Sequence, residues 1–227
     1  LLHLFDNTFE VMSLVLHADP VRLRKGEDLE LLANAPERVR VIDVDDYYLR
    51  RIKPLHGVIL DFLAHLNTSG PQSRQAFALR TASQSLLEAL KDLKHLQKNL
   101  VPNLASPNPY LRKEYVAIRQ RLALMLHTLQ TLPERSPTDI TMELDVLRAS
   151  LQSHDIVANG KLDELIRERR INVESATSLM NDSAYAYNIT SNLVDMAQAL
   201  FTPLEEVHRE IEHELHLNPD EIQEMLA

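Results

Sequence analysis

Apolar residues recur at steps of three and four along most of the chain, a spacing that places them on one face of an α-helix. Six stretches show this pattern, and we expect each of them to form an amphipathic helix. They cover about residues 2–16, 48–66, 79–100, 111–132, 140–158 and 172–201. A shorter helix is expected from about Thr202 onward.

Short sequence signals mark where several helices begin. Each combines a capping side chain with a proline at the first helical position, and three of the four add an acid at the third position. They are Ser136-Pro137, Thr202-Pro203, Asn218-Pro219 and, without the acid, Asn108-Pro109. Ser69-Gly70-Pro71 separates the second and third helices, and Asn159-Gly160 is expected to interrupt the fifth.

Two regions depart from the helical pattern. Residues 18–44 show no clear period and carry mixed charges, so we expect a long crossover with one short helix near residues 29–33. Pro54 falls inside the second helix, where it removes a backbone hydrogen bond and is expected to kink the helix.

Long amphipathic helices with short connections indicate antiparallel neighbours, so we expect an all-α, up-and-down helical bundle. The 227 residues are expected to form one domain, with two three-helix halves at about residues 1–100 and 108–227. The composition favours this fold, because glycine (4 residues) and aromatic residues (5%) are scarce while hydrophobic residues make up 44%.

Charge and cysteine content narrow the class of protein. The net charge of −9 arises from 33 acidic and 24 basic residues, a balance that argues against binding to nucleic acid. The absence of cysteine excludes disulfides and thiolate chemistry and fits a cytoplasmic location. No apolar run approaches the roughly 20 residues that span a bilayer, so we expect these residues to be soluble. The chain opens on Leu1 within a helical pattern, and we expect it to be a fragment.

Catalytic signatures are missing from the sequence. It contains no Gly-rich phosphate loop, no G-x-S-x-G turn, no H-E-x-x-H pair and no zinc-ligand spacing. We therefore expect a protein that binds and positions a partner and is not an enzyme. A metal-dependent hydrolase with carboxylate ligands on bundle helices is an alternative, but it requires paired Glu-x-x-His motifs, which the sequence lacks.

The most informative polar residue is Asp182, which occupies a core position in the apolar stripe of the 172–201 helix. A buried carboxylate needs a cation, a metal or a set of hydrogen-bond donors. Beside the stripe lies a polar strip that consists of Asn181, Tyr185, Asn188 and Asn192. Two hypotheses stay open: an ion pair between Asp182 and a basic residue of a neighbouring helix, and a ligand or divalent-metal site that includes Asn181 and Asn188.

The first helix offers a second candidate site. Asp6 and Glu10 lie one turn apart, with His3 and Asn7 on adjoining turns, so their oxygen atoms could hold a cation. The alternative is that these residues form the solvated face of an amphipathic helix.

Four further histidines and one basic cluster are not expected to form ligand sites. His154 falls on the stripe of the fifth helix and is expected in the core. The cluster at residues 50–53 and the histidines His208, His213 and His216 are expected at the surface, among acidic residues.

Residues 176–185, which read Ala-Thr-Ser-Leu-Met-Asn-Asp-Ser-Ala-Tyr, resemble the signature of the cytosolic domain of bacterial sodium/phosphate cotransporters. Residues 48–55 with 59–62, and the opening His3-Leu4-Phe5-Asp6-Asn7, also look like that family at corresponding places. The domain is similar to the phosphate-uptake regulator (PhoU) family of paired three-helix bundles, whose members control phosphate transport and can bind metal through acidic helical motifs.

The resemblance implies a regulatory domain on the cytoplasmic side of the inner membrane. Its partner would be a membrane-embedded transporter portion, in the same chain or separate, and a homo-oligomer stays open. The family's acid-x-x-x-Asp motif is incomplete here, because Ser178 stands four residues before Asp182 and Ala186 four residues after it. A free-standing PhoU-like accessory protein, or a metal-binding scaffold that docks on a partner, is the alternative.

Overall fold

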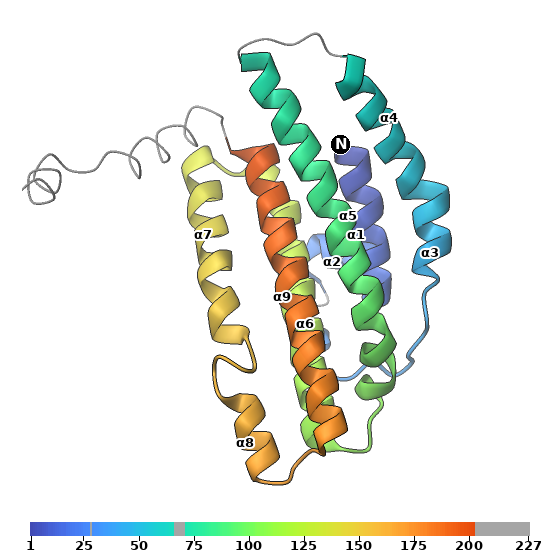
Figure 1. The fold of residues 1–227 in the computed structure, drawn as a ribbon, viewed down its shortest axis with the longest axis vertical. Helices are drawn as coiled ribbons and strands as arrows, with labels where there is room; N and C mark the ends of the chain where they lie inside the picture. The colour runs from blue at the N-terminus through green and yellow to red at the C-terminus, as the bar shows by residue number, and fades with distance from the viewer. Residues whose placement is uncertain (28, 66–70, 203–227) are drawn as a thin grey trace, which may run out of the picture.

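The computed structural model describes residues 1–27, 29–65 and 71–202, and every regular element in these ranges is helical (Figure 1). The α-helices are α1 (Leu2–Val15), α2 (Pro20–Lys25), α3 (Val44–Tyr47), α4 (Lys53–His65), α5 (Pro71–Leu104), α6 (Pro109–Thr131), α7 (Pro137–His154), α8 (Lys161–Arg167) and α9 (Val173–Phe201). Short 3-10 helices lie at Leu31–Ala33 and Leu132–Glu134. The prediction of an all-α protein is confirmed for the described residues.

The centre of the bundle is the antiparallel pair α5 and α9, which make the most extensive contact between helices in the described ranges (Figure 1). Ala82, Ser85 and Ala89 are buried on α5, and such small side chains let a neighbouring helix approach closely. α1 and α4 lie against α5, α7 lies against α9, and α6 lies against both α5 and α9. The grouping into two PhoU-like halves stays a prediction.

The helix starts predicted from capping signals are confirmed where the structure describes them. The Asn108 Oδ1 atom accepts hydrogen bonds from the backbone N–H groups at the start of α6, and Ser136 Oγ accepts one from the Asp139 N–H at the start of α7. The starts predicted at Thr202-Pro203 and Asn218-Pro219 fall in or next to residues 203–227, which lie outside the described residues.

The crossover of residues 18–44 contains more helix than the sequence pattern predicts. The 3-10 turn at Leu31–Ala33 matches the expected short helix, but α2 precedes it, with Asp19 as its capping residue. The crossover is held by Arg119 of α6, whose buried guanidinium donates to four backbone carbonyl oxygens. These belong to Leu16 (2.6 Å), His17 (3.1 Å), Leu32 (3.3 Å) and Asn34 (2.7 Å). A buried cation therefore orders a segment that has no apolar stripe.

The irregularity expected at Pro54 takes the form of a widened turn. A π-helical turn, Tyr48–Ile52, lies directly before α4, and Pro54 sits in the first turn of α4. Proline cannot donate a backbone hydrogen bond to the preceding turn, and a π-helical turn is one way in which a helix absorbs such a break. The helical run thus begins at Val44 and changes form before the proline.

The fifth predicted helix ends earlier than its stripe suggests. α7 stops at His154, and Asp155 Oδ1 then accepts hydrogen bonds from the N–H groups of Val157 and Ala158. Ala158 therefore lies in a turn, and the predicted interruption at Asn159-Gly160 is confirmed, with Gly160 in the left-handed conformation. The prediction of a core position for His154 is wrong, because this end of the helix leaves the side chain exposed.

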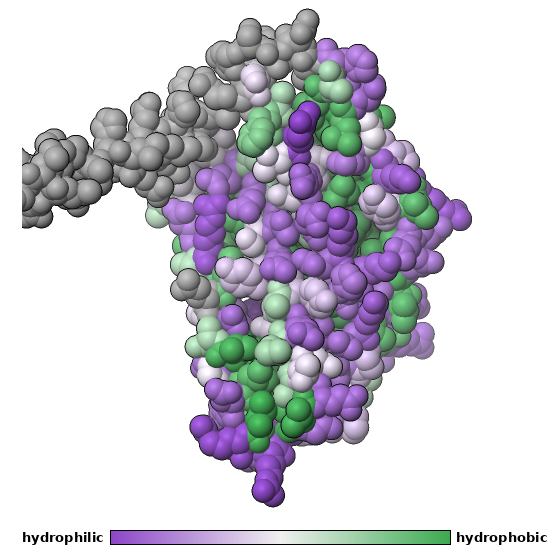
Figure 2. Space-filling model, viewed as in Figure 1, coloured by the Kyte–Doolittle hydropathy of each residue, from purple (hydrophilic) through white to green (hydrophobic). Residues whose placement is uncertain are grey.

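The surface facing the viewer is mainly polar, with apolar residues along the α4 edge and near α8 and the start of α9 (Figure 2). Val58 and Phe62 of α4 and Val173 of α9 are more than half exposed. In the described ranges, no helix has both the length and the apolar composition required to cross a membrane.

Gly26 ends α2, and it has less space for a side chain than Gly160, which precedes α8. Both adopt positive φ angles, 72° and 74°, but a Cβ on Gly26 would lie 3.0 Å from His127 Cε1, whereas one on Gly160 would meet nothing within 4 Å. We expect Gly160→Ala to cost about 1 kcal/mol of unfolding free energy, the backbone penalty alone. Gly26→Ala should cost about 1 kcal/mol more, since the His127 ring, with Nδ1 2.9 Å from the Leu23 carbonyl oxygen, must move. Urea denaturation of both variants tests this, and equal losses would contradict it.

Candidate functional site

Asp182 lies on the buried face of α9, between Leu179 and Ala186 of the same stripe. Its side chain is fully enclosed, with 0% exposure. The prediction of a core carboxylate is therefore confirmed. Burial raises the pKa of Asp182, and hydrogen bonds from two neighbouring side chains oppose this rise.

The partners of Asp182 are neutral donors from two other helices. The Tyr115 hydroxyl of α6 donates to Oδ2 at 2.5 Å, and the Asn99 side-chain amide of α5 donates to Oδ1 at 3.3 Å. Tyr115 is itself fully buried, and burial together with the carboxylate raises its pKa, so it keeps its proton. Within the described part of the chain, Asp182 therefore forms no ion pair with a basic residue, and its carboxylate instead joins α5, α6 and α9.

The polar strip beside Asp182 continues along the seam of α5 and α9. The rings of His95 and Tyr185 stack with centroids 5.4 Å apart. One turn further, the Asn188 side chain forms a hydrogen bond with Asp92, whose pKa is raised by burial and lowered by His95 and by this bond. The seam thus pairs polar side chains of the two helices at successive turns, with Asp182 as its most buried member.

The predicted ligand set does not converge at Asp182. Asn181 and Asn188 are both exposed, and the hydrogen bond of Asn188 goes to Asp92. Among the residues that the structure describes, no group of three or more His, Asp or Glu side chains is placed to hold a metal ion. The divalent-metal hypothesis at Asp182 stays a prediction, with a test given in the Discussion.

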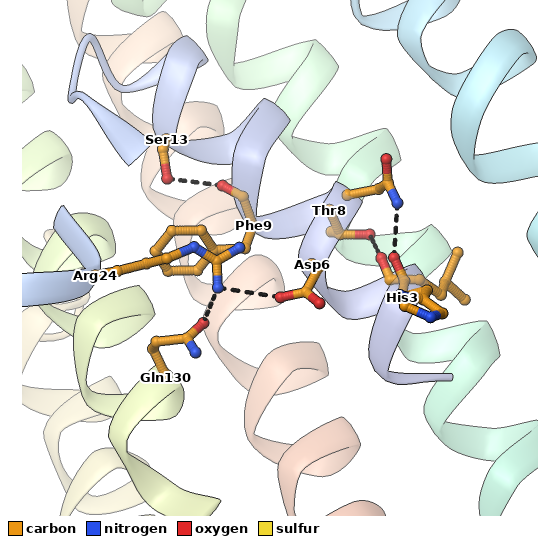
Figure 3. Close-up of polar contacts among 9 residues, drawn as sticks. His3, Asp6, Thr8, Phe9, Ser13, Arg24 and Gln130 are labelled. Carbon is orange, nitrogen blue, oxygen red and sulfur yellow. Dashed lines mark hydrogen bonds and ion pairs between the residues drawn. The ribbon is translucent and has the colours of Figure 1, made fainter. Parts of the chain in front are cut away.

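Asp6 and Glu10 of α1 face separate arginines. Asp6 forms an ion pair at 3.0 Å with Arg24 of α2, and the same guanidinium donates to Gln130 Oε1 at 2.6 Å (Figure 3). Arg24 also lies over the Phe9 ring, with 4.3 Å between guanidinium carbon and ring centroid. Glu10 lies 3.7 Å from Arg51. The two carboxylates therefore bind separate cations of the protein at the partly exposed edge of α1.

The backbone carbonyls of α1 accept its own polar side chains. The Thr8 and Ser13 hydroxyls donate to the carbonyl oxygens of Leu4 and Phe9, four residues earlier (Figure 3). The amide of Asn7 likewise donates to the His3 carbonyl oxygen at 2.7 Å. Asn7 thus completes the local structure of α1, and the candidate cation site there consists of residues already engaged in the fold.

The basic cluster at residues 50–53 lies on and beside the π-helical turn. Arg50 forms an ion pair with Asp46 at 2.6 Å, and Arg51 approaches Glu10. Both arginine side chains are exposed, which agrees with the predicted surface position. The C-terminal histidines His208, His213 and His216 lie outside the described residues.

Sequence reasoning missed a groove between α6 and α7. It has a volume of about 370 Å³, α9 forms its floor, and apolar side chains such as Leu122, Met125 and Leu147 line it. Leu124 on one rim is 51% exposed and Val146 on the other is 63% exposed. A pattern of stripes could have hinted at it, since Leu124 and Val146 are apolar residues outside the predicted stripes.

Comparisons of the chain with protein-family models, with curated protein sequences and with solved structures find no match. The function proposed below accordingly rests on the sequence resemblance and on the contacts that its residues make in the fold.

Proposed function

We propose that the chain is a PhoU-like regulatory domain of a sodium-dependent phosphate cotransporter, which acts on the cytoplasmic side of the membrane by docking and not by catalysis. The observation that carries this proposal is that residues of the segment 176–185, which resembles the family signature, contact several other helices. Asp182 and Tyr185 contact α5 and α6, and the Ser183 hydroxyl accepts a weak hydrogen bond, at 3.4 Å, from the Ile156 N–H beyond α7.

Because these residues contact other helices, their resemblance to the family signature supports a fold shared with that family more than a ligand shared with it. The motif residues join helices that are far apart in sequence, so substituting them would change how the bundle assembles. The second support is the apolar groove beside α7, which has the form of a surface that accepts an amphipathic helix of a partner. Transport itself would belong to a membrane-embedded portion.

Two measurements test the proposal. The full reading frame should contain apolar runs of about 20 residues that encode membrane spans. Cells that produce this full-length protein should show sodium-dependent phosphate uptake, and deletion of the region corresponding to residues 1–227 should change the uptake rate while the amount of membrane-inserted protein stays equal. Uptake that is absent, or that is indifferent to the deletion, would refute the role.

A free-standing accessory protein is the alternative to the tethered domain. In that case the reading frame contains no membrane span, and the isolated chain should co-sediment with vesicles only when they contain a phosphate transporter. Vesicles of the same lipids without the transporter serve as the control.

A further inference from the structure

The groove between α6 and α7 is open to solvent and lined mainly by apolar side chains. Its floor includes Ser183, Ala186 and Thr190 of α9, and its two rims carry the exposed side chains of Leu124 and Val146. Exposed apolar rims on both sides of a floor of small side chains are the features of a site that binds the apolar face of a helix.

One end of the groove is lined by a cation, the guanidinium of Arg121 of α6. His154 of α7 lies beside it, and because burial and Arg121 lower the pKa of His154, its ring is neutral at neutral pH. Burial lowers the pKa of Arg121, and although the Glu114 carboxylate acts on it, Arg121 forms no ion pair or hydrogen bond with any residue that the structure describes. The acids that line the groove are engaged elsewhere: Glu143 pairs with Arg135, and Asp155 caps the turn after α7. Arg121 is therefore available to pair with an acidic residue of a ligand.

The sequence that follows α9 has matching chemistry. Residues 203–227 contain eight acidic residues and one arginine. Leu204, Val207, Ile211 and Leu215 recur at steps of three and four, which is the period of an amphipathic helix. The segment thus combines an apolar stripe with a strongly acidic remainder.

Residues 203–227 begin near the groove and are long enough to reach its far end. α9 ends at the end of the bundle where α7 begins (Figure 1), and the far end of the groove, at Ser183, lies 18 residues back along α9 from Phe201. That is roughly 27 Å at the helical rise of about 1.5 Å per residue. As a helix, residues 203–227 would extend roughly 37 Å, so they reach the whole groove from the end of α9.

We propose that residues 203–227 bind in the groove of their own chain as an amphipathic helix, with the apolar stripe against α6, α7 and α9 and an acidic residue toward Arg121. The groove is then an internal binding site that a partner helix would have to compete for. This inference does not depend on the proposed function, because it concerns only the isolated chain.

The experiment uses the full chain, whose lack of cysteine allows a single nitroxide label at a chosen site. A label on Val146→Cys should broaden the amide resonances of residues 203–227. The matched control is Val58→Cys on α4, a valine of similar exposure (68% against 63%) on another part of the surface, and its label should leave those resonances sharp. Equal broadening from both labels, or none from Val146→Cys, would overturn the proposal.

Mixing separates binding within one chain from binding between chains. Isotope-labelled wild type mixed with unlabelled, spin-labelled Val146→Cys chain should show no broadening of residues 203–227. Broadening in this mixture would show that a second copy fills the groove and would refute the intramolecular site.

Hydrogen exchange gives an independent measure. Amides of residues 203–227 should exchange at least about tenfold more slowly than in the free peptide, the factor that corresponds to about 1.4 kcal/mol of binding. Val146→Glu should remove most of this protection and Val58→Glu should leave it unchanged. Protection that survives Val146→Glu would count against the groove.

Discussion

Replacement of Arg119 by methionine is expected to lower the free energy of unfolding by about 3–5 kcal/mol. Four backbone carbonyls lose their charged donor, two of them in buried and two in partly buried contacts, and each buried acceptor left unsatisfied costs about 1–3 kcal/mol. The guanidinium no longer has to be desolvated, which offsets part of this loss. Methionine keeps most of the aliphatic stem, so the change isolates the polar contacts. Urea denaturation measures the effect.

Arg112→Met on the same helix is the matched control. Arg112 is half-buried and donates to one carbonyl, that of Ser106, at 2.7 Å, so we expect a loss of about 1 kcal/mol. A second signal is His17, whose pKa is lowered to about 4 by burial and, to a smaller extent, by Arg119. In Arg119→Met the pKa of His17 should rise but stay below 6.5, as NMR titration would show. Equal losses in the two variants, with an unchanged His17, would contradict the role of Arg119.

Asp182→Ala is expected to cost about 2–4 kcal/mol, because the buried Tyr115 hydroxyl and the Asn99 amide both lose their acceptor. Asp182→Asn should stay within about 1 kcal/mol of wild type at neutral pH, since the amide oxygen still accepts from Tyr115 and no charge is buried. Thermal and urea unfolding of the two variants would measure the difference. A loss in Asp182→Asn as large as that in Asp182→Ala would contradict this account.

The unfolding free energies of wild type and Asp182→Asn, compared as a function of pH, test the direction of the pKa shift of Asp182. Burial raises the pKa of Asp182 above its unfolded value near 3.8, so the native state binds the proton more tightly than the unfolded state. Wild type should therefore gain stability relative to Asp182→Asn as pH falls through the folded pKa toward 3.8, and the gain should be complete below that value. Parallel stability curves would show that the carboxylate is not desolvated.

The same two proteins test the divalent-metal hypothesis. Both Asp182 oxygens accept hydrogen bonds from the protein, so we expect millimolar magnesium, manganese or iron to leave the melting temperature of wild type unchanged relative to chelator. A rise in wild type that Asp182→Asn abolishes would instead establish a metal site there.

The long helices could be predicted from the sequence because each buries one apolar stripe against the core. α2 could not be found in this way, since Leu23 is its one buried residue. The sequence signals for α2 are its two ends. Asp19-Pro20 repeats the cap-and-proline pattern that predicted the start of α6 at Asn108-Pro109, and Gly26 provides the left-handed residue at the C-terminal end. The early end of α7 at His154 was missed because the capping by Asp155 competes with an apolar stripe that continues in sequence.

The burial of Asp182 followed from its register in the stripe, but its partners did not. Tyr115 and Asn99 lie 67 and 83 residues away in sequence, and no local pattern specifies which side chains meet across a helix interface. Arg119 was missed for a related reason. Its partners are backbone carbonyls, which exist at every residue and leave no trace in the sequence.

The antiparallel pairing of α5 with α9 has a consequence for synthesis on the ribosome. About a hundred residues separate the end of α5 at Leu104 from the end of α9 at Phe201, and at about 5–20 residues per second they require roughly 5–20 s to be made. During this interval the α5 surface that will contact α9 has no native partner. The nascent chain should therefore bind holdase chaperones when it is stalled after α5, and release them once α9 has left the exit tunnel.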